Sequence, residues 1–467
     1  METFHGFILW LDGYLWGPAM LILLFGTHIF LTIRLRFIQL YTPLAIKLSL
    51  AKDNEGEGDV SQFGALTTAL AATIGTGNIV GVATAVALGG PGAVLWMWLT
   101  GVFGIATKYS EALLSVYYRQ KTSTGEMLGG PMYAIETGLK QKWLAVLFCI
   151  FTSIAAFGIG NMVQANSIST LVKETFDISP YITGAVITIM TAVVILGGIK
   201  SISTVCEKLV PFMAIFYVAG CAIILVINAA YLIPAVSLIV KSAFSPRAAG
   251  GGFAGATIMM AARFGIARGL FSNESGLGSA PIVAAAAKTK NPVRQALVSS
   301  TGTFWDTVVV CAMTGLVLVS SIIKEPETMQ GLQGSALTKA VFASIPYVGP
   351  AVLTVGLLTF VYSTILGWSY YGERTTEYLL GKRAILPYRV LWVMAVMVGS
   401  VMPLPLVWDM ADAANAMMAI PNLVSLILLN GVVVAQTKKY LWDEELEAIG
   451  IGQAQPVPIP IREDDEQ

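Results

Sequence analysis

The chain has 467 residues, of which 55% are hydrophobic and 12% are charged, and its mean hydropathy is +0.72. This composition excludes an ordinary soluble domain and indicates a polytopic membrane protein that lies in the lipid bilayer. The 28 basic and 28 acidic residues balance, so no net field would attract nucleic acid. The two histidines, His5 and His28, are too few for a metal centre or for histidine-based catalysis. The cysteines lie in apolar segments without metal-type spacing and are interpreted as packing residues: Cys149, Cys206, Cys221 and Cys311.

Hydropathy and charge breaks predict an all-α protein with eleven membrane-spanning helices. After Asp59 the next charged residue is Lys108, and the stretch between them is long enough for two spans. The first span is followed by Arg34 and Arg36 and preceded by acidic residues, the reverse of the charge order in a cleaved signal peptide. The expected spans are 14–34, 62–88, 92–118, 143–168, 180–199, 209–230, 255–287, 295–322, 349–372, 388–402 and 406–436.

The distribution of basic residues predicts the orientation. If the N-terminus lies outside, most Lys and Arg fall in connections that face the cytoplasm, as the positive-inside rule requires. An odd number of spans then leaves the C-terminus in the cytoplasm. The polar tail after Trp442 is expected to be solvated and largely disordered.

Two predicted spans are interrupted by glycines and polar residues. The first interruption is "ATIGTGNIVG", residues 72–81 of the second span, and the other is "SNESGLGS", residues 272–279 of the seventh. They lie five spans apart, so they would occupy corresponding positions in two five-helix halves of inverted topology, an arrangement typical of secondary transporters. We therefore expect an extra N-terminal helix in residues 1–40, five-helix repeats in 62–230 and 250–436, and a cytoplasmic tail in 437–467.

An unwound turn explains why a span would place glycines at its centre. Its free N–H groups suit a carboxylate, and its free C=O groups suit Na+ or an ammonium. The second span has no acidic side chain, so a cation bound there would rely on carbonyl and hydroxyl oxygens. The alternative is that the glycines only allow close helix packing, which we favour for Gly81, Gly101 and Gly104.

Three segments closely resemble the alanine or glycine:cation symporter family of bacteria and archaea. They are "ATIGTGNIVGVATAVALGGPGAVLWMWLTGVFG", "GGPMYAIETGL" and "ARGLFSNESGLGSAP", and the similarity covers nearly the whole hydrophobic body. The resemblance implies a leucine-transporter type fold and coupled uptake of alanine or glycine with Na+ by alternating access. It also implies a location in the inner (plasma) membrane of a prokaryote, a protein that is not an enzyme, and function as a monomer.

The resemblance further implies which residues bind the substrate. The first interruption contributes Thr73, Gly75, Thr76, Gly77 and Asn78, and the second contributes Phe271, Ser272, Asn273, Glu274, Ser275 and Gly276. Trp368 could wall the pocket. Gln164 is a polar residue inside the fourth span, where a substrate contact and a helix–helix hydrogen bond are both open interpretations.

For the ion, the resemblance implies the carbonyl groups of Ala71 and Ile74 and the hydroxyls of Ser363 and Thr364. Carbonyl and hydroxyl oxygens are suitable ligands for a hard cation such as Na+. The alternative for both hydroxyls is a hydrogen bond back to a carbonyl of their own helix.

Charged residues inside other spans are expensive and need a partner or a function. Lys108 and Glu111 are expected to form a local pair, because they lie three residues apart on one helix. Two arginines could pair with two aspartates as an external gate, or all four could be scaffolding: Arg263 and Arg268 with Asp409 and Asp412. Asp306 has no obvious partner in the sequence, and its role stays open.

Other functions have weaker support from the sequence. A cation channel would show a carbonyl-filter repeat or a ring-forming acidic motif, and neither is recognisable. An enzyme would need a nucleophile with a base, but the only histidine within the spans is His28. Among transporters, H+ in place of Na+, or another small solute, remains the alternative.

Overall fold

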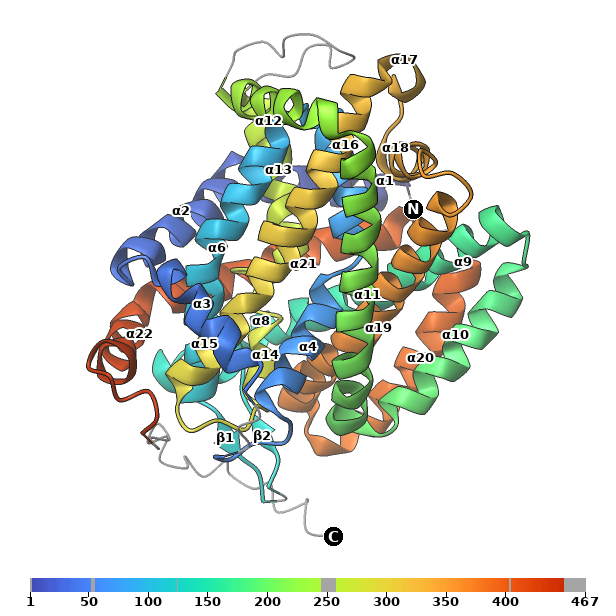
Figure 1. The fold of residues 1–467 in the computed structure, drawn as a ribbon. Helices are drawn as coiled ribbons and strands as arrows, with labels where there is room; N and C mark the ends of the chain where they lie inside the picture. Colours follow the sequence, from blue (N-terminus) through green and yellow to red (C-terminus); the bar gives the residue numbers. More distant parts are fainter. Residues whose placement is uncertain (1, 52–54, 124, 245–257, 403–404, 449–467) are drawn as a thin grey trace.

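The computed structural model describes residues 2–51, 55–123, 125–244, 258–402 and 405–448, and within these ranges the chain is almost entirely helical (Figure 1). The α-helices are α1 Glu2–Leu15, α2 Pro18–Arg34, α3 Thr42–Ser49, α4 Gln62–Thr73, α5 Val82–Gly89, α6 Gly92–Tyr117, α7 Pro131–Tyr133, α8 Lys142–Ala155, α9 Val163–Phe176, α10 Pro180–Ile195, α11 Gly198–Ile227, α12 Ala229–Phe244, α13 Ile258–Asn273, α14 Pro281–Ala284, α15 Pro292–Thr303, α16 Ala312–Lys324, α17 Pro326–Met329, α18 Gly334–Phe342, α19 Gly349–Leu380, α20 Ile385–Val401, α21 Pro405–Leu428 and α22 Asn430–Thr437.

Short segments of other geometry join several of these helices. A small antiparallel hairpin, β1 Gln120–Lys121 and β2 Met127–Leu128, lies at the bottom of the view in Figure 1. The 3₁₀ turns are Ile38–Tyr41 and Lys382–Ala384, and the π-helical turns are Gly77–Gly81, Ala134–Gly138, Ala156–Met162, Phe304–Cys311 and Lys438–Trp442. Four of the π turns lie within or beside long helices, where such turns are frequent at functional sites.

Among the described residues, seven helices are long and apolar enough to cross a membrane, and the bent pair formed by Gln62–Thr73 and Gly77–Gly89 makes an eighth if it is one span. The eleven spans and the inverted halves therefore stay predictions. The apolar helices α10 and α12 are shorter, the predicted seventh span begins outside the described residues, and the predicted last span is divided at Leu429 into α21 and α22. The sequence also did not predict α12.

The outer surface is apolar, as expected for helices that face lipid. Large exposed side chains include Val193 on α10, Val226 on α11 and Leu391 on α20, with exposed fractions of 73%, 76% and 53%. A surface of this kind in water would be an aggregation hazard, whereas hydrocarbon stabilises it. The four cysteines are buried and unpaired, in agreement with their expected packing role.

Four helix–helix contacts hold the interrupted helices in place. The helix α6 packs against both α13 and α15, and α4 packs against α11 and α19. The start of α4 is fixed by Ser61, whose Oγ accepts a hydrogen bond from the Gly64 amide and donates one to Glu207 of α11. Gly64 has no room for a Cβ, because Ser203 of α11 would lie 2.2 Å from it.

A buried arginine links the parts of the chain that flank the two interruptions, at the end of the molecule where the β1–β2 hairpin lies. Arg119, just after α6, donates to the carbonyls of Ala285 and Ala287, which follow α14, and to the carbonyl of Glu57, which precedes α4. The same two segments pair directly, since the Lys288 amide donates to the Val60 carbonyl over 2.8 Å. Desolvation lowers the pKa of Arg119 from its usual value.

Candidate functional site

The first interruption is a sharp bend between α4 and the π turn that begins α5. The two parts differ in direction by 53°, and Ile74 has an extended backbone at the end of α4. The amide of Gly75 would donate to Ala71 in an unbroken helix, but it donates instead to the side-chain oxygen of Asn78 over 2.9 Å. The side chain of Asn78 thus replaces a helical acceptor and leaves the Ala71 carbonyl available.

Asp306 has several partners in the structure, although the sequence indicated none. This fully buried carboxylate accepts hydrogen bonds from the side chains of Asn78 (2.6 Å), Ser272 (2.9 Å) and Thr307 (2.6 Å). Asn78 belongs to the first interruption and Ser272 precedes the second. Asp306 lies in the π turn between α15 and α16, and its hydrogen bonds therefore connect the first interruption with the end of α13, just before the second.

The second interruption, predicted over residues 272–279, is a loop over residues 274–280 between α13 and α14, because α13 continues to Asn273. The loop has three left-handed backbone positions. Glu274, Gly276 and Gly278 have φ values of +54°, +92° and +87°. At the glycines this conformation is free of strain, whereas Glu274 adopts it at a cost. Since strained residues cluster at functional sites, Glu274 is a candidate functional residue.

Glu111 of α6 supplies the acceptor that this loop needs. Its Oε1 accepts from the amides of Gly276 (3.0 Å) and Gly278 (3.1 Å) and from the side chain of Asn422 (2.7 Å). Lys108 and Glu111, which were expected to form a local pair, attract each other electrostatically but form no ion pair within 4.0 Å, and Lys108 Nζ has no hydrogen-bond partner among the described residues. The carboxylate points to unpaired amides of the loop instead.

Glu274 is also held by side chains. Its Oε1 accepts from the indole N–H of Trp368 over 3.1 Å, and its Oε2 accepts from the hydroxyl of Ser279. Trp368 is 1% exposed, and it packs so closely on Gly160 that a Cβ there would lie 2.4 Å from the tryptophan. The tryptophan and the carboxylate are therefore fixed together.

A cavity of about 20 Å³ lies where the two interruptions meet. Its lining residues are Ala72, Thr73, Gly75, Thr76, Gly77, Ile159, Gln164, Phe271, Glu274, Thr364, Trp368 and Asn415. The structure therefore brings eight of the predicted substrate residues to one cavity: Thr73, Gly75, Thr76, Gly77, Gln164, Phe271, Glu274 and Trp368.

The other predicted substrate residues lie behind this cavity. Asn78 and Ser272 bind Asp306, Ser275 contacts the Thr303 hydroxyl, and the Gly276 amide donates to Glu111. Asn273 lines a different cavity. Gln164 donates to the carbonyl of Ile159 within its own helical segment, and its side-chain oxygen has no partner among the described residues.

The predicted ion ligands also lie together. The Ser363 hydroxyl lies 3.1 Å from the Ala71 carbonyl oxygen, so α19 contacts the end of α4 at the freed carbonyl. Thr364 Oγ1 lines the cavity and would lie 2.7 Å from a Cβ at Gly75. Both hydroxyls also donate back to the Phe360 carbonyl, over 2.8 and 3.0 Å. Each hydroxyl oxygen keeps lone pairs that a cation could use.

Sequence reasoning missed three parts of the site. Asn415 of α21 lines the cavity, and its Oδ1 has no partner among the described residues. Ile159 and Ala72 complete the wall. The signal for Asn415 was an amide in an apolar helix, which is also typical of helix–helix hydrogen bonding.

The expected gate pairs are not formed in the described part of the chain. No ion pair within 4.0 Å joins Arg263 or Arg268 to either aspartate, and Asp409 instead lies 2.6 Å from His5 of α1. The Asp412 carbonyl accepts from the indole of Trp16. The N-terminal helices thus contact the residues that the sequence had assigned to a gate.

Comparisons with known proteins agree with this geometry. Residues 1–449 match the sodium:alanine symporter family. The sodium/alanine symporter AgcS of Methanococcus maripaludis is 54% identical, over 92% of this chain and 95% of that protein. The probable sodium/glutamine symporter GlnT of Bacillus subtilis is 34% identical, over 92% of this chain and 89% of that protein.

Among solved structures, MhsT in complex with L-phenylalanine has a TM-score of 0.57 at 16% identity and covers 83% of this chain and 95% of that one. A likeness at this identity concerns the fold, which is that of the leucine-transporter type. Three observations support one identification. Two interrupted helices meet at one cavity, residues 1–449 match the family, and the fold is shared. The chain belongs to the sodium:alanine symporter family and is a Na+-coupled amino acid symporter.

Proposed function

We propose that this symporter imports alanine or glycine together with Na+ by alternating access. The observation that carries the proposal is the cavity at which both helix interruptions meet. Thr76 and Gly77 lie at the start of a helical segment, where the first amide groups lack helical acceptors. The Gly75 and Asn78 amides are taken by the Asn78 side chain and the Gly75 carbonyl, so the proposal concerns the amides of Thr76 and Gly77. Such a helix start is suited to the carboxylate of an amino acid.

The opposite wall of the cavity suits an ammonium group. The side-chain oxygens of Gln164 and Asn415 are buried and have no partner among the described residues, and both residues line the cavity. An ammonium has three N–H donors and requires such acceptors. A zwitterion would therefore bind with its carboxylate at the first interruption and its ammonium near these amides.

The size of the cavity supports a short side chain. Phe271 and Trp368 belong to its wall, and its volume is about 20 Å³. Burying a larger side chain in such a space would force the surrounding helices apart. We expect alanine and glycine to be accepted and leucine and phenylalanine to be rejected.

For the ion, we propose coordination by the carbonyls of Ala71 and Ile74 and the hydroxyls of Ser363 and Thr364. The support is the 3.1 Å distance between Ser363 Oγ and the Ala71 carbonyl oxygen. Ion and substrate would lie on either side of the same unwound turn, so each should raise the affinity for the other.

The proposed arrangement in the membrane is the one predicted from the sequence. It places the N-terminus outside and the C-terminus in the cytoplasm of a prokaryote, with residues 1–40 as an extra helix and inverted repeats in 62–230 and 250–436. The helix bend of 53° in the first repeat supports it. We expect a monomer to be sufficient for transport.

Uptake of labelled alanine and glycine into proteoliposomes tests the proposal. We expect uptake to require an inward Na+ gradient and to fail with a K+ gradient or a proton gradient alone. Excess alanine should compete strongly, and excess leucine should not. Equal competition by leucine or glutamine would contradict the proposed substrate, and uptake driven by a proton gradient would contradict the proposed ion. Single-channel currents without solute would indicate a channel instead.

A further inference from the structure

The two oxygens of the buried Asp306 carboxylate bind different parts of the chain. Its Oδ1 accepts from the Asn78 side chain over 2.6 Å, whereas its Oδ2 accepts from the hydroxyls of Ser272 and Thr307 over 2.9 and 2.6 Å. The Lys108 ammonium also attracts this carboxylate electrostatically. An ionised carboxylate only accepts hydrogen bonds, so three donors suit it. The protein therefore satisfies Asp306, and its role depends on the groups that it holds.

The amide group of Asn78 is oriented by its acceptors. Its Nδ2 donates to the Asp306 carboxylate over 2.6 Å and to the backbone carbonyl of the same residue over 3.2 Å. Both acceptors bind only the nitrogen end of the amide, so Oδ1 points the other way. There Oδ1 accepts from the Gly75 amide over 2.9 Å. Asp306 therefore determines which end of the Asn78 side chain faces the first interruption.

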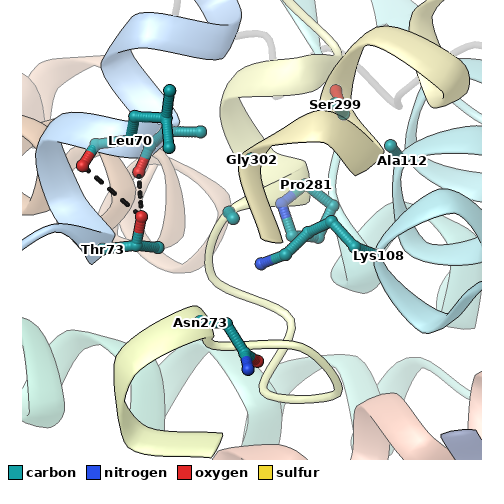
Figure 2. Close-up of a pocket in the computed structure, with 10 residues that line it drawn as sticks. Leu70, Thr73, Lys108, Ala112, Asn273, Pro281, Ser299 and Gly302 are labelled. Atoms are coloured by element: carbon teal, nitrogen blue, oxygen red, sulfur yellow. Dashed lines mark hydrogen bonds between the residues drawn. The ribbon is translucent and has the colours of Figure 1, made fainter. Parts of the chain in front are cut away.

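The last turn of α4 uses its earlier carbonyl groups internally. The Thr73 hydroxyl donates to the carbonyls of Ala69 and Leu70 over 3.2 and 3.4 Å. Figure 2, a close-up of the other cavity, shows this hydroxyl turned back toward Leu70. The Ile74 amide donates to the same Leu70 carbonyl over 2.8 Å. These bonds leave out the next carbonyl along the helix, which belongs to Ala71.

The state of the Ala71 carbonyl depends on Asn78. In an unbroken helix this carbonyl would accept from the Gly75 amide, four residues later. Because Asn78 Oδ1 accepts from that amide, the Ala71 oxygen remains open to a ligand, with the Ser363 hydroxyl 3.1 Å away. A chain of two hydrogen bonds thus leads from the Asp306 carboxylate to the end of α4.

We propose that Asp306 is a positioning residue that sets the Na+ affinity of the first interruption without contacting the ion. The inference rests on the ion site proposed above, in which the Ala71 carbonyl is a ligand. When the bond to Asp306 is lost, the Asn78 amide can rotate away from Gly75. The freed Gly75 amide then extends α4 by binding the Ala71 carbonyl. The cation loses a ligand oxygen, so its affinity falls.

Thermal unfolding of the purified protein measures Na+ affinity without any need for transport. NaCl replaces KCl at constant ionic strength, and the readout is the Na+ concentration that gives half of the stabilisation. A general loss of packing lowers every unfolding temperature but leaves this concentration unchanged. We expect the concentration to rise several-fold in Asp306→Ala and in Asn78→Ala, because both variants lose the same hydrogen bond.

The matched control is Thr307→Val. It removes another donor to the same carboxylate but leaves the bond between Asp306 Oδ1 and Asn78 in place. Its Na+ affinity should therefore equal that of the wild type. A loss in Thr307→Val as large as that in Asp306→Ala would show that any disturbance of the carboxylate weakens the ion, and it would overturn the proposal.

Two further variants separate positioning from a direct effect of the negative charge. Asp306→Asn keeps an oxygen that can accept from Asn78, so its Na+ affinity should lie between those of the wild type and Asp306→Ala. The double variant Asp306→Ala with Asn78→Ala should bind Na+ no more weakly than the weaker single variant, since both changes act through one bond. Additive losses, or Asp306→Asn as weak as Asp306→Ala, would mean that the charge acts on the ion directly and would overturn the proposal.

Wild-type Na+ affinity in Asp306→Ala would also overturn it. If Asp306→Ala does not fold, Asp306→Asn and Asn78→Ala decide, because each must weaken Na+ binding and their double variant must bind no more weakly than Asn78→Ala alone. Thr364→Ala tests the ion site separately. Unchanged Na+ affinity in Thr364→Ala refutes the ion site itself, whereas a loss there with none in the Asp306 variants refutes only the role of Asp306. Alanine enters none of these measurements, so the identity of the substrate does not affect them.

Discussion

The two helix interruptions differ in what satisfies their backbone groups. At the first, the Asn78 side chain accepts a hydrogen bond from the Gly75 amide, and the Ser363 hydroxyl contacts the freed Ala71 carbonyl. At the second, Glu111 and Asn422 bind the backbone of Gly276, and Glu111 also binds Gly278. The first turn therefore keeps groups for ligands, while the second is largely satisfied by the protein.

This contrast indicates a division of labour. A backbone that a distant helix already binds is costly to rearrange, because buried amides left without acceptors lose free energy. The second interruption acts as a fixed support that presents Phe271 and Glu274. We propose that the first is the ligand-facing turn, so its substitutions should affect transport more than stability.

The largest expected effect is that of bulky side chains at the first turn. In Gly75→Leu the new Cβ would lie 2.7 Å from Thr364 Oγ1, and in Gly77→Leu it would lie 3.3 Å from the Phe271 ring. Both changes fill the cavity, so we expect uptake to be abolished at normal membrane expression. The matched control Gly81→Ala meets no atom closer than 3.9 Å and should transport normally. Near-normal uptake by Gly75→Leu or Gly77→Leu would show that this turn does not line the site.

At the second interruption, removal of the support should reduce stability. Glu111→Ala deprives two buried amides and Asn422 of their acceptor, and we expect a loss of about 3 kcal/mol in the free energy of unfolding. Chemical unfolding in detergent measures it. Compared with Glu111→Ala, Asn78→Ala at the first turn should lose less of the free energy of unfolding and more of the alanine uptake. If Asn78→Ala is the less stable of the two, the division between the interruptions is wrong.

A smaller effect is expected at the proposed ion ligands. In Thr364→Ala one hydroxyl ligand is lost and water replaces it in part, so the Na+ concentration for half-maximal uptake should rise several-fold. Apparent alanine affinity should fall at limiting Na+ and recover at saturating Na+. The control is Thr359→Ala on the same helix, where the exposed hydroxyl bonds back to its own helix. Unchanged Na+ dependence in both Ser363→Ala and Thr364→Ala would place the ion elsewhere.

The smallest effect concerns the chain that follows the second interruption. Glu447 pairs with Lys290 and Arg294, and these partners lower the pKa of its carboxyl from the usual 4.5. A lowered folded-state pKa means that the contact stabilises above the unfolded pKa and is lost as the pH falls through the folded value. The protection factors of the amides in residues 285–294, which correct for the intrinsic slowing of exchange at low pH, should therefore fall slightly between pH 7 and pH 4, and Glu447→Gln should show the lower protection already at pH 7. Identical protection in the wild type and Glu447→Gln at pH 7 would contradict a stabilising role of the Glu447 contacts.

Sequence patterns predicted the interruptions well and their surroundings poorly. Glycines and polar residues in apolar spans mark unwound turns because only such residues tolerate them there, which is why Gly75, Gly77 and Glu274 line the cavity. The hydrogen-bond partners of Glu111 and Asp306 could not be predicted, since they depend on which helix faces which. Spacing on one helix favoured a Lys108–Glu111 pair, but the unpaired amides of Gly276 and Gly278 compete more strongly for that carboxylate.

The position of Arg119 has a consequence for the speed of the transport cycle. One guanidinium holds the carbonyls of Glu57, Ala285 and Ala287, so the chain entering α4 and the chain leaving α14 cannot separate unless these bonds break. If the two segments tilt together, these bonds stay intact. The conformational change of the transport cycle then has a small activation enthalpy, and its rate depends weakly on temperature. If the two segments separate, the hydrogen bonds of the buried Arg119 must break, and the rate-limiting step then has a large activation enthalpy. The temperature dependence of the turnover rate therefore distinguishes a transport cycle in which the two segments move together from one in which they separate.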